Sequence, residues 1–261
     1  MKDSPQNSRT TLEIVQAHNT CWGRGDLNGC MGLYHPDMVF VDHFSGCTYS
    51  GPKLQKHVAS VLARSRLETL TYLDRVRVDG DTAFLQYQES ILSSQGSSLM
   101  QISACDTVRV HAGLIMEINE YAFPMGKLTS SRTFGHQIQA EKIGLSARAL
   151  GFLIQDLCEY FERKKPFLDS NLSLADVAMA TGYTRNQISY ALNHGLGKSF
   201  HQFLAEERIK AVLAMPLALT GNRIWASAQK AGFKSPSTFY ACFRKLTGLT
   251  PGQYFAHDTG R

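Results

Sequence analysis

Hydrophobic residues recur at two different periods along this chain of 261 residues. Between about residue 70 and residue 123 they alternate with polar residues, which is typical of half-buried strands. From residue 146 onward they recur every three or four positions, which is typical of amphipathic helices. The change of period predicts a strand-rich first half and a helical second half.

The first half combines a few helices with a run of strands. Helices are expected over 11–22, 28–34 and 51–64, and strands over 38–42, 70–78, 82–93, 99–111 and 115–123. Asp79-Gly80-Asp81 and Ala112-Gly113 lie between neighbouring strands and predict tight hairpin turns. This order predicts an α+β cone over residues 11–125, in which a curved antiparallel sheet wraps over helices. The polar residues 1–10 predict a flexible tail.

The second half contains one helical design twice. The segments Leu174–Tyr183 and Ile224–Phe233 each carry an Ala four positions after the first residue, a Gly eight positions after it, and then an aromatic residue. The small Ala lets two helices approach closely, and the Gly takes the positive φ that turns the chain. Two such segments, each followed by a polar amphipathic helix, predict an all-α double helix-turn-helix domain over residues 146–257.

Charge is divided unevenly between the two halves. Residues 1–126 contain 10 Lys and Arg against 13 Asp and Glu, whereas residues 127–261 contain 17 against 9. A basic domain favours a polyanionic partner, so double-stranded DNA is the expected partner of the second half. The polar, aperiodic residues 126–145 predict a linker between the two domains.

Composition argues against several other classes of protein. No run of about 18 apolar residues is present, so no membrane span is expected. The N-terminus lacks the apolar core of a signal peptide, and the six cysteines form no Cys-x-x-Cys pair. We therefore expect a cytoplasmic protein with free thiols, no metal site and no cofactor.

The second helix of each turn carries the residues expected to contact DNA. Arg185, Asn186 and Gln187 are suited to bidentate hydrogen bonds with purine edges in the major groove. Arg244 and Lys245 are expected to touch phosphate groups. The complete expected set is Thr184, Arg185, Asn186, Gln187, Ser189, Tyr190, Lys234, Ser235, Ser237, Thr238, Tyr240, Arg244 and Lys245. The first unit is expected to supply most base specificity, and the second mainly to position the protein.

The stretch Ala231–Tyr254 resembles the signature of the AraC/XylS family of transcription regulators. It contains a Gly-Phe pair, a Ser-x-x-x-Phe-x-x-x-Phe-Arg-x-x-x-Gly run and a closing Thr-Pro-x-x-Tyr. Leu196–Phe200 and Glu207-Arg208 are similar to the region between the family's two readers, whereas Ser227 stands where the family usually has an apolar residue. The resemblance covers about residues 146–257 and implies a seven-helix DNA-binding unit with two readers.

The first half resembles the SnoaL-like branch of the nuclear-transport-factor-like and ketosteroid-isomerase-like superfamily. The residues that carry this resemblance are Gly25-Asp26, His35–Phe40, Tyr49-x-Gly51 and Gly113–Glu117. The resemblance implies a cone that encloses an apolar pocket at its wide end.

Residues that could line such a pocket follow from strand alternation and from the aromatic residues nearby. Phe40 shares a strand face with Asp42, and Tyr87 shares one with Leu85 and Glu89. The complete expected ligand-binding set is Trp22, Tyr34, Phe40, Asp42, Tyr72, Tyr87, Glu89 and Tyr121. The expected ligand is a small apolar or aromatic effector.

Three functions fit these features. The first is a one-component transcription regulator whose cone senses a small ligand, forms a homodimer, or does both. The second is an isomerase or cyclase with a regulatory DNA-binding tail, which requires Asp42 or His43 to point into an open pocket as general base. In the third, the cone only dimerises and side chains fill its pocket. We favour the first and expect no enzymatic activity, because a domain fused to a DNA reader more often senses than catalyses.

Overall fold

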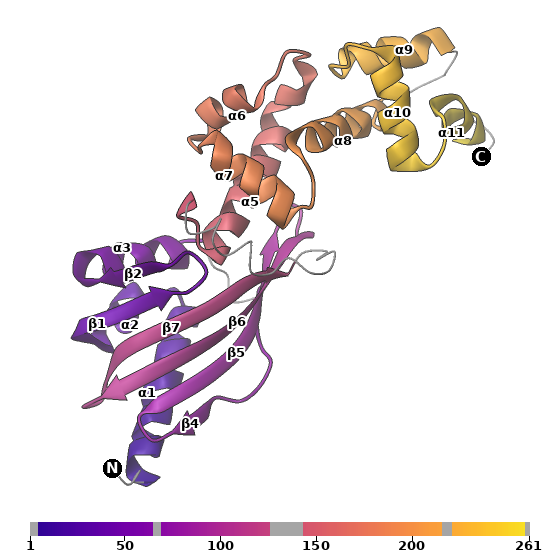
Figure 1. Ribbon diagram of the computed structural model, residues 1–261. Coiled ribbons are helices and arrows are strands. Elements are labelled where there is room, and N and C mark those ends of the chain that lie inside the picture. The colour runs from indigo at the N-terminus through magenta and orange to yellow at the C-terminus, as the bar shows by residue number, and fades with distance from the viewer. Residues whose placement is uncertain (1–4, 65–68, 126–142, 216–220, 259–261) are drawn as a thin grey trace. The chain divides into compact units, whose positions relative to one another are not determined.

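The computed structural model describes residues 5–64, 69–125, 143–215 and 221–258 (Figure 1). The chain forms two compact units, which divide between Gln155 and Asp156. The sequence predicts the border ten residues earlier, so this expectation is corrected: the first helix of the second half belongs to both units. Residues 126–142 of the expected linker lie outside the described residues.

A curved sheet forms the core of the N-terminal unit (Figure 1). Its strand order is β2-β1-β7-β6-β5-β3, and β4 pairs with β5 beside β3. All described pairs are antiparallel except that of β1 with β7. The strands are β1 (Tyr34–Asp42), β2 (Cys47–Ser50), β3 (Leu70–Tyr72), β4 (Arg77–Asp79), β5 (Thr82–Leu92), β6 (Ser98–His111) and β7 (Leu114–Met125).

The two expected hairpin turns are confirmed. Ala112 and Gly113 both have positive φ values, 49° and 79°, which two-residue hairpins of the primed type require. Gly80 has a φ of 59° between β4 and β5. The single strand expected over 70–78 is wrong, because the chain leaves the sheet at Leu73, where the Asp74 carboxylate accepts hydrogen bonds from Arg75 and Arg77. The short strand β2 was not expected.

Three helices belong to the N-terminal unit: α1 (Pro5–Gly23), α2 (Leu27–Gly32) and α3 (Gly51–Leu62). Helix α1 packs against β4, β5, β6 and β7, and α3 packs against β1 and β2. The expectation of a flexible tail over residues 1–10 is wrong for the described part, because α1 already begins at Pro5. Ser8 and Thr11 hydrogen bond to the backbone of Gly80, which attaches the start of this helix to the β4–β5 turn.

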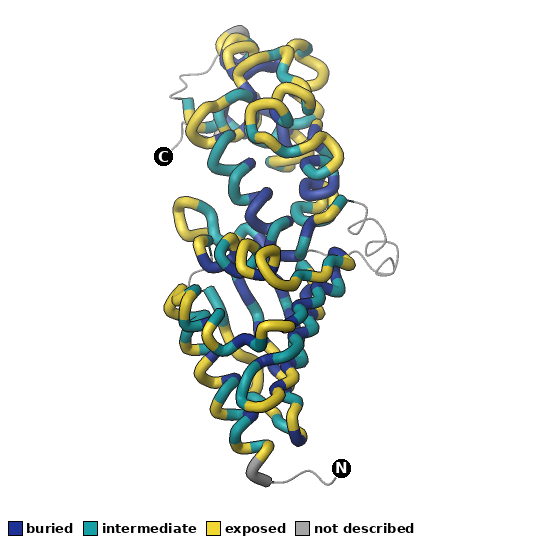
Figure 2. The backbone as a smooth tube through the Cα atoms, turned by 90° about the vertical axis from the view of Figure 1, so that its left-hand side faces the viewer, coloured by how far each residue is buried: buried dark blue, intermediate teal, exposed yellow. Residues whose placement is uncertain are grey.

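Helix α5 (Ala147–Lys164) begins in the N-terminal unit and continues into the C-terminal unit. Its first two turns are mostly buried (Figure 2). Gly151 lies so close to the sheet that an added Cβ would come within 2.6 Å of Ile91 Cγ1. Gln155 donates to the carbonyl oxygen of Leu92, and Arg64 donates to the carbonyl oxygen of Phe152. These contacts are the physical reason why the border between the units falls inside a helix.

All described secondary-structure elements of the C-terminal unit are helices. The 3₁₀ turn Pro166–Leu168 follows α5, and the π-helical turn Ala191–Gly195 extends α7. The remaining helices are α6 (Leu174–Thr181), α7 (Arg185–Tyr190), α8 (Phe200–Leu213), α9 (Gly221–Lys230), α10 (Pro236–Thr247) and α11 (Pro251–Asp258). None of the described helices combines the length and the apolar composition that crossing a bilayer requires.

Candidate DNA interface and ligand cavity

The first helix-turn-helix consists of α6, the turn at Gly182 and α7. Ser173 and Asp176 form a reciprocal capping box at the start of α6, and Gly182 ends that helix with a φ of 77°. Thr184 and Gln187 form a second capping box, with the backbone amide of each donating to the other's side-chain oxygen. Two capped helices joined at a left-handed glycine are the geometry that the sequence predicts for this segment.

The start of α7 presents the residues expected to read bases. Thr184, Arg185 and Asn186 are exposed, whereas Gln187 and Ser189 are half-buried. The capping box occupies the Gln187 side-chain oxygen, and the Ser189 hydroxyl accepts from Asn193 Nδ2 at 3.3 Å. Arg185 and Asn186 are therefore the exposed side chains of this helix best suited to bidentate base contacts.

Tyr190 is a correction to the expected DNA-binding set. Only 4% of the residue is exposed, and its ring packs on His194 with the two centroids 4.3 Å apart. Burial raises the pKa of the Tyr190 hydroxyl to about 12. Ile188 is also buried, so a helix this short is packed on two sides and leaves only its first turn for a partner.

The second helix-turn-helix consists of α9, the turn at Gly232 and α10. Gly232 has a φ of 95°, and an added Cβ would meet the carbonyl oxygen of Phe167 and the Arg208 side chain. Ser235 caps α10, and its Oγ accepts from the Thr238 backbone. Phe239 and Phe243 are fully buried in the core of this unit, as their four-residue spacing predicts.

The exposed face of α10 and its approach carry most of the expected residues of the second unit. Ser235 is half-buried because it caps the helix, and the other six residues are exposed. Those six are Lys234, Ser237, Thr238, Tyr240, Arg244 and Lys245.

Arg208 on α8 links the 3₁₀ turn that precedes the first helix-turn-helix to the turn of the second. Its Nε atom donates to the carbonyl oxygen of Phe167 at 2.8 Å, and its Nη2 atom donates to that of Asp169 at 2.8 Å. Its guanidinium lies 5.9 Å from the centroid of the Phe233 ring in the second turn. The sequence marks Arg208 only through the family resemblance, and its bridging contacts depend on the tertiary structure.

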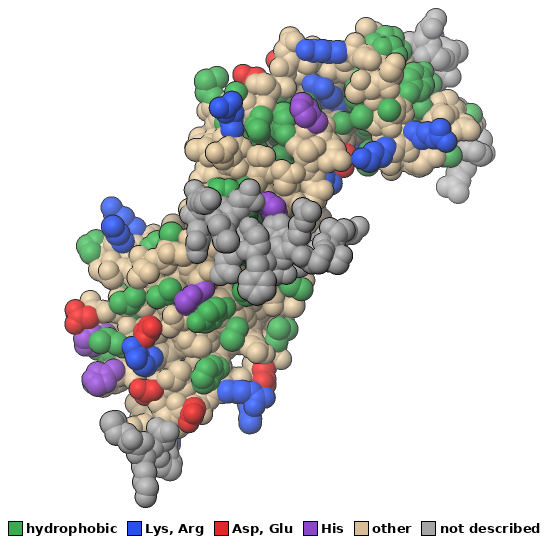
Figure 3. Space-filling view, in the orientation of Figure 1, with side chains coloured by type: hydrophobic (Ala, Val, Ile, Leu, Met, Phe, Trp, Pro, Cys, Tyr) green, Lys and Arg blue, Asp and Glu red, His purple; other side chains and the backbone are tan. Residues whose placement is uncertain are grey.

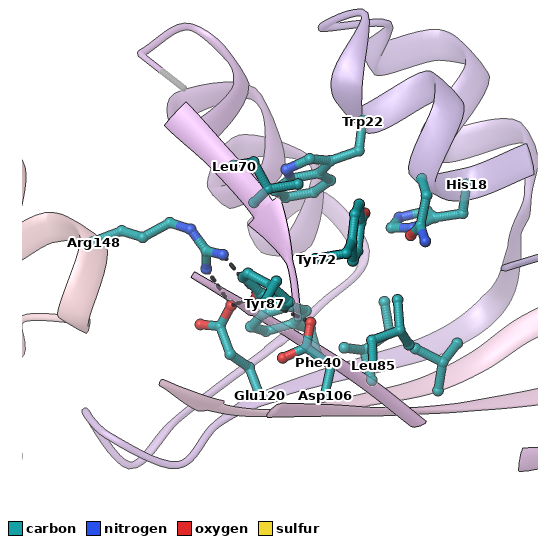
Figure 4. Close-up of a pocket in the computed structure, with 13 residues that line it drawn as sticks. His18, Trp22, Phe40, Leu70, Tyr72, Leu85, Tyr87, Asp106, Glu120 and Arg148 are labelled. Carbon is teal, nitrogen blue, oxygen red and sulfur yellow. Dashed lines mark hydrogen bonds and ion pairs between the residues drawn. The ribbon is translucent and has the colours of Figure 1, made fainter. Parts of the chain in front are cut away.

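The N-terminal unit encloses a cavity of about 40 Å³ between α1, the sheet and the start of α5 (Figure 4). Four residues of the expected ligand-binding set line it: Trp22, Phe40, Tyr72 and Tyr87. The other residues that line it are His18, Asn19, Leu70, Leu85, Asp106, Val108, Ile118, Glu120 and Arg148. This volume holds no more than a few water molecules.

The remaining four residues of the expected ligand set are corrections, because none of them lines the cavity. Tyr34 is buried in the core with its hydroxyl 2.8 Å from His18 Nε2. Glu89 is buried against Arg148. Tyr121 points to the outer face of the sheet, where its ring stacks on His43 with centroids 4.2 Å apart.

Asp42 is the fourth correction, and it organises a turn. Its carboxylate accepts hydrogen bonds from the backbone amides of Phe44 and Ser45 and from the Ser45 hydroxyl. Burial raises the pKa of Asp42, although its hydrogen bonds with Ser45 and Phe44 act in the opposite direction. Neither Asp42 nor His43 lines the cavity, so the general base that the enzyme hypothesis requires is not found at these positions.

Arg148 enters the cavity wall from the first turn of α5, where 6% of its side chain is exposed. Its Nε donates to Glu89 Oε2 at 2.7 Å. Its Nη1 donates to Glu120 Oε1, and its Nη2 donates to the Tyr87 hydroxyl at 2.7 Å (Figure 4). The Tyr87 hydroxyl in turn lies 3.1 Å from Asp106 Oδ2. These five side chains are called the Arg148 cluster below.

The Arg148 cluster holds three carboxylates and one guanidinium. Burial raises the pKa of Asp106 well above its usual range, and the charge of Glu120 adds to that effect. Burial works against the charge of Arg148, but the carboxylates around it, Glu120 first, keep its pKa above the ordinary value. Burial also lowers the pKa of the nearby His18 to about 4, so this residue adds no positive charge at neutral pH.

Alternation along β6 and β7 could have identified two of these residues. Asp106 lies between the buried Ala104 and Val108, and Glu120 lies between the buried Ile118 and Ala122. An acidic residue at an inward position of a strand is a signal of a polar site. The sequence carries no such signal for Arg148, because the helical pattern around it does not show which domain it packs against.

All six cysteines are free thiols. Among the residues that the structure describes, no group of His, Cys, Asp and Glu is arranged to hold a metal ion.

Two family models match the chain in separate segments. A helix-turn-helix domain matches residues 177–257, and a SnoaL-like domain matches residues 15–118. An uncharacterized HTH-type transcriptional regulator of Staphylococcus aureus is 30% identical over 101 residues, which are 39% of this chain and 13% of that protein. The HTH-type transcriptional activator AarP of Providencia stuartii is 29% identical over 93 residues, 36% of this chain and 68% of that protein.

The solved structures add little to these matches. An NTF2-like protein of unknown function from Mesorhizobium loti has 18% sequence identity and a TM-score of 0.39, over 47% of this chain and 97% of that one. The strand order of the N-terminal unit and its match to the family model are the observations that identify its fold. The chain thus carries a SnoaL-like domain in its N-terminal half and a helix-turn-helix domain of the AraC type in its C-terminal half.

Proposed function

We propose that this protein is a sequence-specific DNA-binding transcription regulator whose SnoaL-like domain senses a small ligand. One observation carries the proposal: two helix-turn-helix units, each with a left-handed glycine and a side-chain cap on its second helix, lie in one basic domain. The relatives named as transcription regulators support it. The match covers only 13% of the length of the S. aureus regulator.

The two units are proposed to do different work on DNA. Arg185 and Asn186 on α7 are suited to purine edges, so the first unit is proposed to supply most of the base specificity. The exposed face of α10 is rich in Ser, Thr and Lys and ends in Arg244 and Lys245, which suits contacts with phosphate. The second unit is therefore proposed to position the protein more than to read sequence.

Selection of bound duplexes from a random DNA library by the full chain tests this proposal. We expect an enriched site with two conserved segments about one helical turn apart, because the two reading helices lie on one domain. Binding that shows no sequence preference at any salt concentration would leave only electrostatic attraction and would contradict the proposal.

Ligand sensing is proposed to act through α5. Its first half is packed into the N-terminal unit and its second half belongs to the C-terminal unit, so a ligand that rearranges the Arg148 cluster changes the helix that both units share. A ligand shifts such an equilibrium only if it binds the two arrangements with different affinity. Footprinting with and without candidate ligands measures that difference directly.

The outer face of the sheet is proposed to form a homodimer. Phe84 on β5 and Tyr121, Phe123 and Met125 on β7 are all exposed there, and Figure 3 shows hydrophobic side chains over the strands. Exposed apolar groups of this kind mark interaction surfaces. Sedimentation of the full chain is expected to give a dimer, and Phe123→Lys a monomer. A wild-type monomer at all concentrations would contradict the dimer.

A further inference from the structure

This inference rests on the regulator function proposed above and concerns the chemical class of the ligand that the cavity binds. We propose that the cavity binds a small protonated amine with a short apolar or aromatic body, and that its ammonium group binds to Asp106. Three independent features of the cavity support this: an unpaired acceptor, an excess of carboxylates, and aromatic walls.

The unpaired acceptor is Asp106 Oδ1. This atom is buried and has no hydrogen-bond partner among the described residues. The other oxygen, Oδ2, accepts a hydrogen bond from the Tyr87 hydroxyl at 3.1 Å. This bond orients the carboxyl group and leaves Oδ1 available to a ligand. A buried acceptor without a donor is unfavourable by itself, and a cationic donor in the cavity would satisfy it.

The excess of carboxylates in the cavity wall predicts that the ligand is positively charged. Arg148 lies in the wall and pairs with both Glu89 and Glu120, so two carboxylates face one guanidinium even before the Asp106 carboxyl group is counted. His18 also lies in the wall, but it is neutral at physiological pH because burial lowers its pKa to about 4. A buried group of this composition attracts a cation and repels an anion, since water is largely excluded.

The aromatic walls suit the body of an amine. Trp22 and Tyr72 lie across the cavity from the Arg148 cluster, and Phe40 and Leu85 complete an apolar surface (Figure 4). The face of an aromatic ring attracts a cation within about 6 Å, most strongly when the ring is that of Trp. An ammonium group near Asp106 would thus be contacted by both a carboxylate and ring faces.

The size of the cavity limits the ligand. About 40 Å³ is far below the roughly 300 Å³ at which pockets for drug-sized ligands begin. Entry of anything larger than a methylammonium ion requires the wall to move. Tyr72 is the side chain placed to do so, because it is 43% exposed and stands on the three-residue edge strand β3.

Titration of the full chain with matched probes tests the proposal. The probes are methylammonium and benzylammonium as cations, benzyl alcohol as the neutral match and benzoate as the anion. Binding is followed by calorimetry and by the shift of the melting temperature. We expect the ammonium probes to bind and both benzyl alcohol and benzoate to bind at least tenfold more weakly, as one charge-assisted hydrogen bond implies.

Variants assign the binding to the cavity. Asp106→Asn keeps the shape but removes the group that can ionise, and is expected to weaken ammonium binding about tenfold or more. Glu117→Gln removes a carboxylate from the outer face of β7, outside the cavity, and is expected to change nothing. If Asp106→Asn does not fold, Tyr72→Leu on the exposed edge strand replaces it and is expected to weaken benzylammonium binding several-fold.

Three outcomes overturn the proposal: benzyl alcohol or benzoate binding as tightly as benzylammonium, ammonium binding unchanged in Asp106→Asn, or no ammonium probe binding at all. DNA selection with the same preparation separates this failure from that of the proposed function. Specific DNA binding without amine binding removes only the ligand class, whereas loss of specific DNA binding removes the regulator itself.

Discussion

His18 shows how one buried side chain makes the N-terminal unit sensitive to acid. Its Nε2 atom lies 2.8 Å from the Tyr34 hydroxyl, and burial lowers its pKa from 6.5 to about 4. Between these two values the unfolded chain binds a proton that the folded chain does not. The free energy of unfolding therefore falls as the pH drops from 6.5 towards 4, by about 3 kcal/mol in total.

His18→Gln is expected to remove this part of the acid sensitivity, because the amide side chain does not titrate. Urea unfolding of both proteins at neutral pH and near pH 4 measures the difference. Equal loss of stability in the two proteins would show that His18 is protonated in the folded state at no penalty, contrary to its burial.

Arg185 tests base reading by a single side chain. Arg185→Ala is expected to weaken binding to the selected DNA site by about 1–3 kcal/mol and to relax the preference at one base pair. The control Arg9→Ala removes the same charge from an exposed position on α1 and should leave DNA binding unchanged. A loss of equal size on every DNA sequence would assign Arg185 to a phosphate contact instead. Fluorescence anisotropy on matched and mismatched duplexes separates these results.

At the scale of elements, α5 depends on a glycine for its close approach to the sheet. In Gly151→Ala, the added Cβ would come within 2.6 Å of Ile91 Cγ1 and 2.9 Å of Met100 Cε. Overpacking of this kind outweighs the higher helix propensity of Ala, so we expect a net destabilisation of about 1 kcal/mol. Thermal unfolding of the full chain measures it.

Gly252→Ala is the matched control, since it makes the same chemical change in another helix. Nothing lies within 4 Å of a Cβ added at Gly252 in α11. The only expected effect is therefore the higher helix propensity of Ala. Gly252→Ala should be as stable as the parent protein or up to about 1 kcal/mol more stable. Opposite signs for the two variants establish that contact with the sheet, rather than helix propensity, decides the effect at Gly151.

At the scale of the whole molecule, the Arg148 cluster ties the shared helix to the SnoaL-like domain. Arg148→Met leaves buried carboxylates without their cation and is expected to destabilise the chain by about 3–5 kcal/mol. Glu120→Gln in the Arg148→Met background removes part of the uncompensated charge. The double variant should therefore be less destabilised than the sum of the two single changes, by about 0.5–3 kcal/mol. Denaturant unfolding of the four proteins gives this coupling, and strict additivity would contradict it.

The local features of the DNA-binding half were readable from the sequence because they depend on neighbours along the chain. Gly182 and Gly232 have the positive φ that their place after a helix predicts, and Phe239 and Phe243 are buried as a four-residue spacing predicts. Tyr190 was wrong, because the burial of a residue on a short helix depends on what packs against its far side.

The long strands and their hairpin turns were also determined by the sequence alone, through alternation and through the positive-φ turn at Ala112-Gly113. Alternation assigns a face but not a position along the cone. Tyr87 and Glu89 share a face, yet only Tyr87 lines the cavity, because Arg148 covers Glu89. The composition of the cavity was decided by contacts between residues far apart in the chain.

The sequence by itself thus determined the two kinds of domain and the turns that build them, since periodicity and glycine conformation are local properties. Only the tertiary structure decided where one domain ends and the other begins. The helical pattern over residues 146–165 is the same whichever unit it packs against. The close approach of Gly151 to the sheet and the burial of Arg148 among three distant carboxylates assign its first half to the SnoaL-like domain.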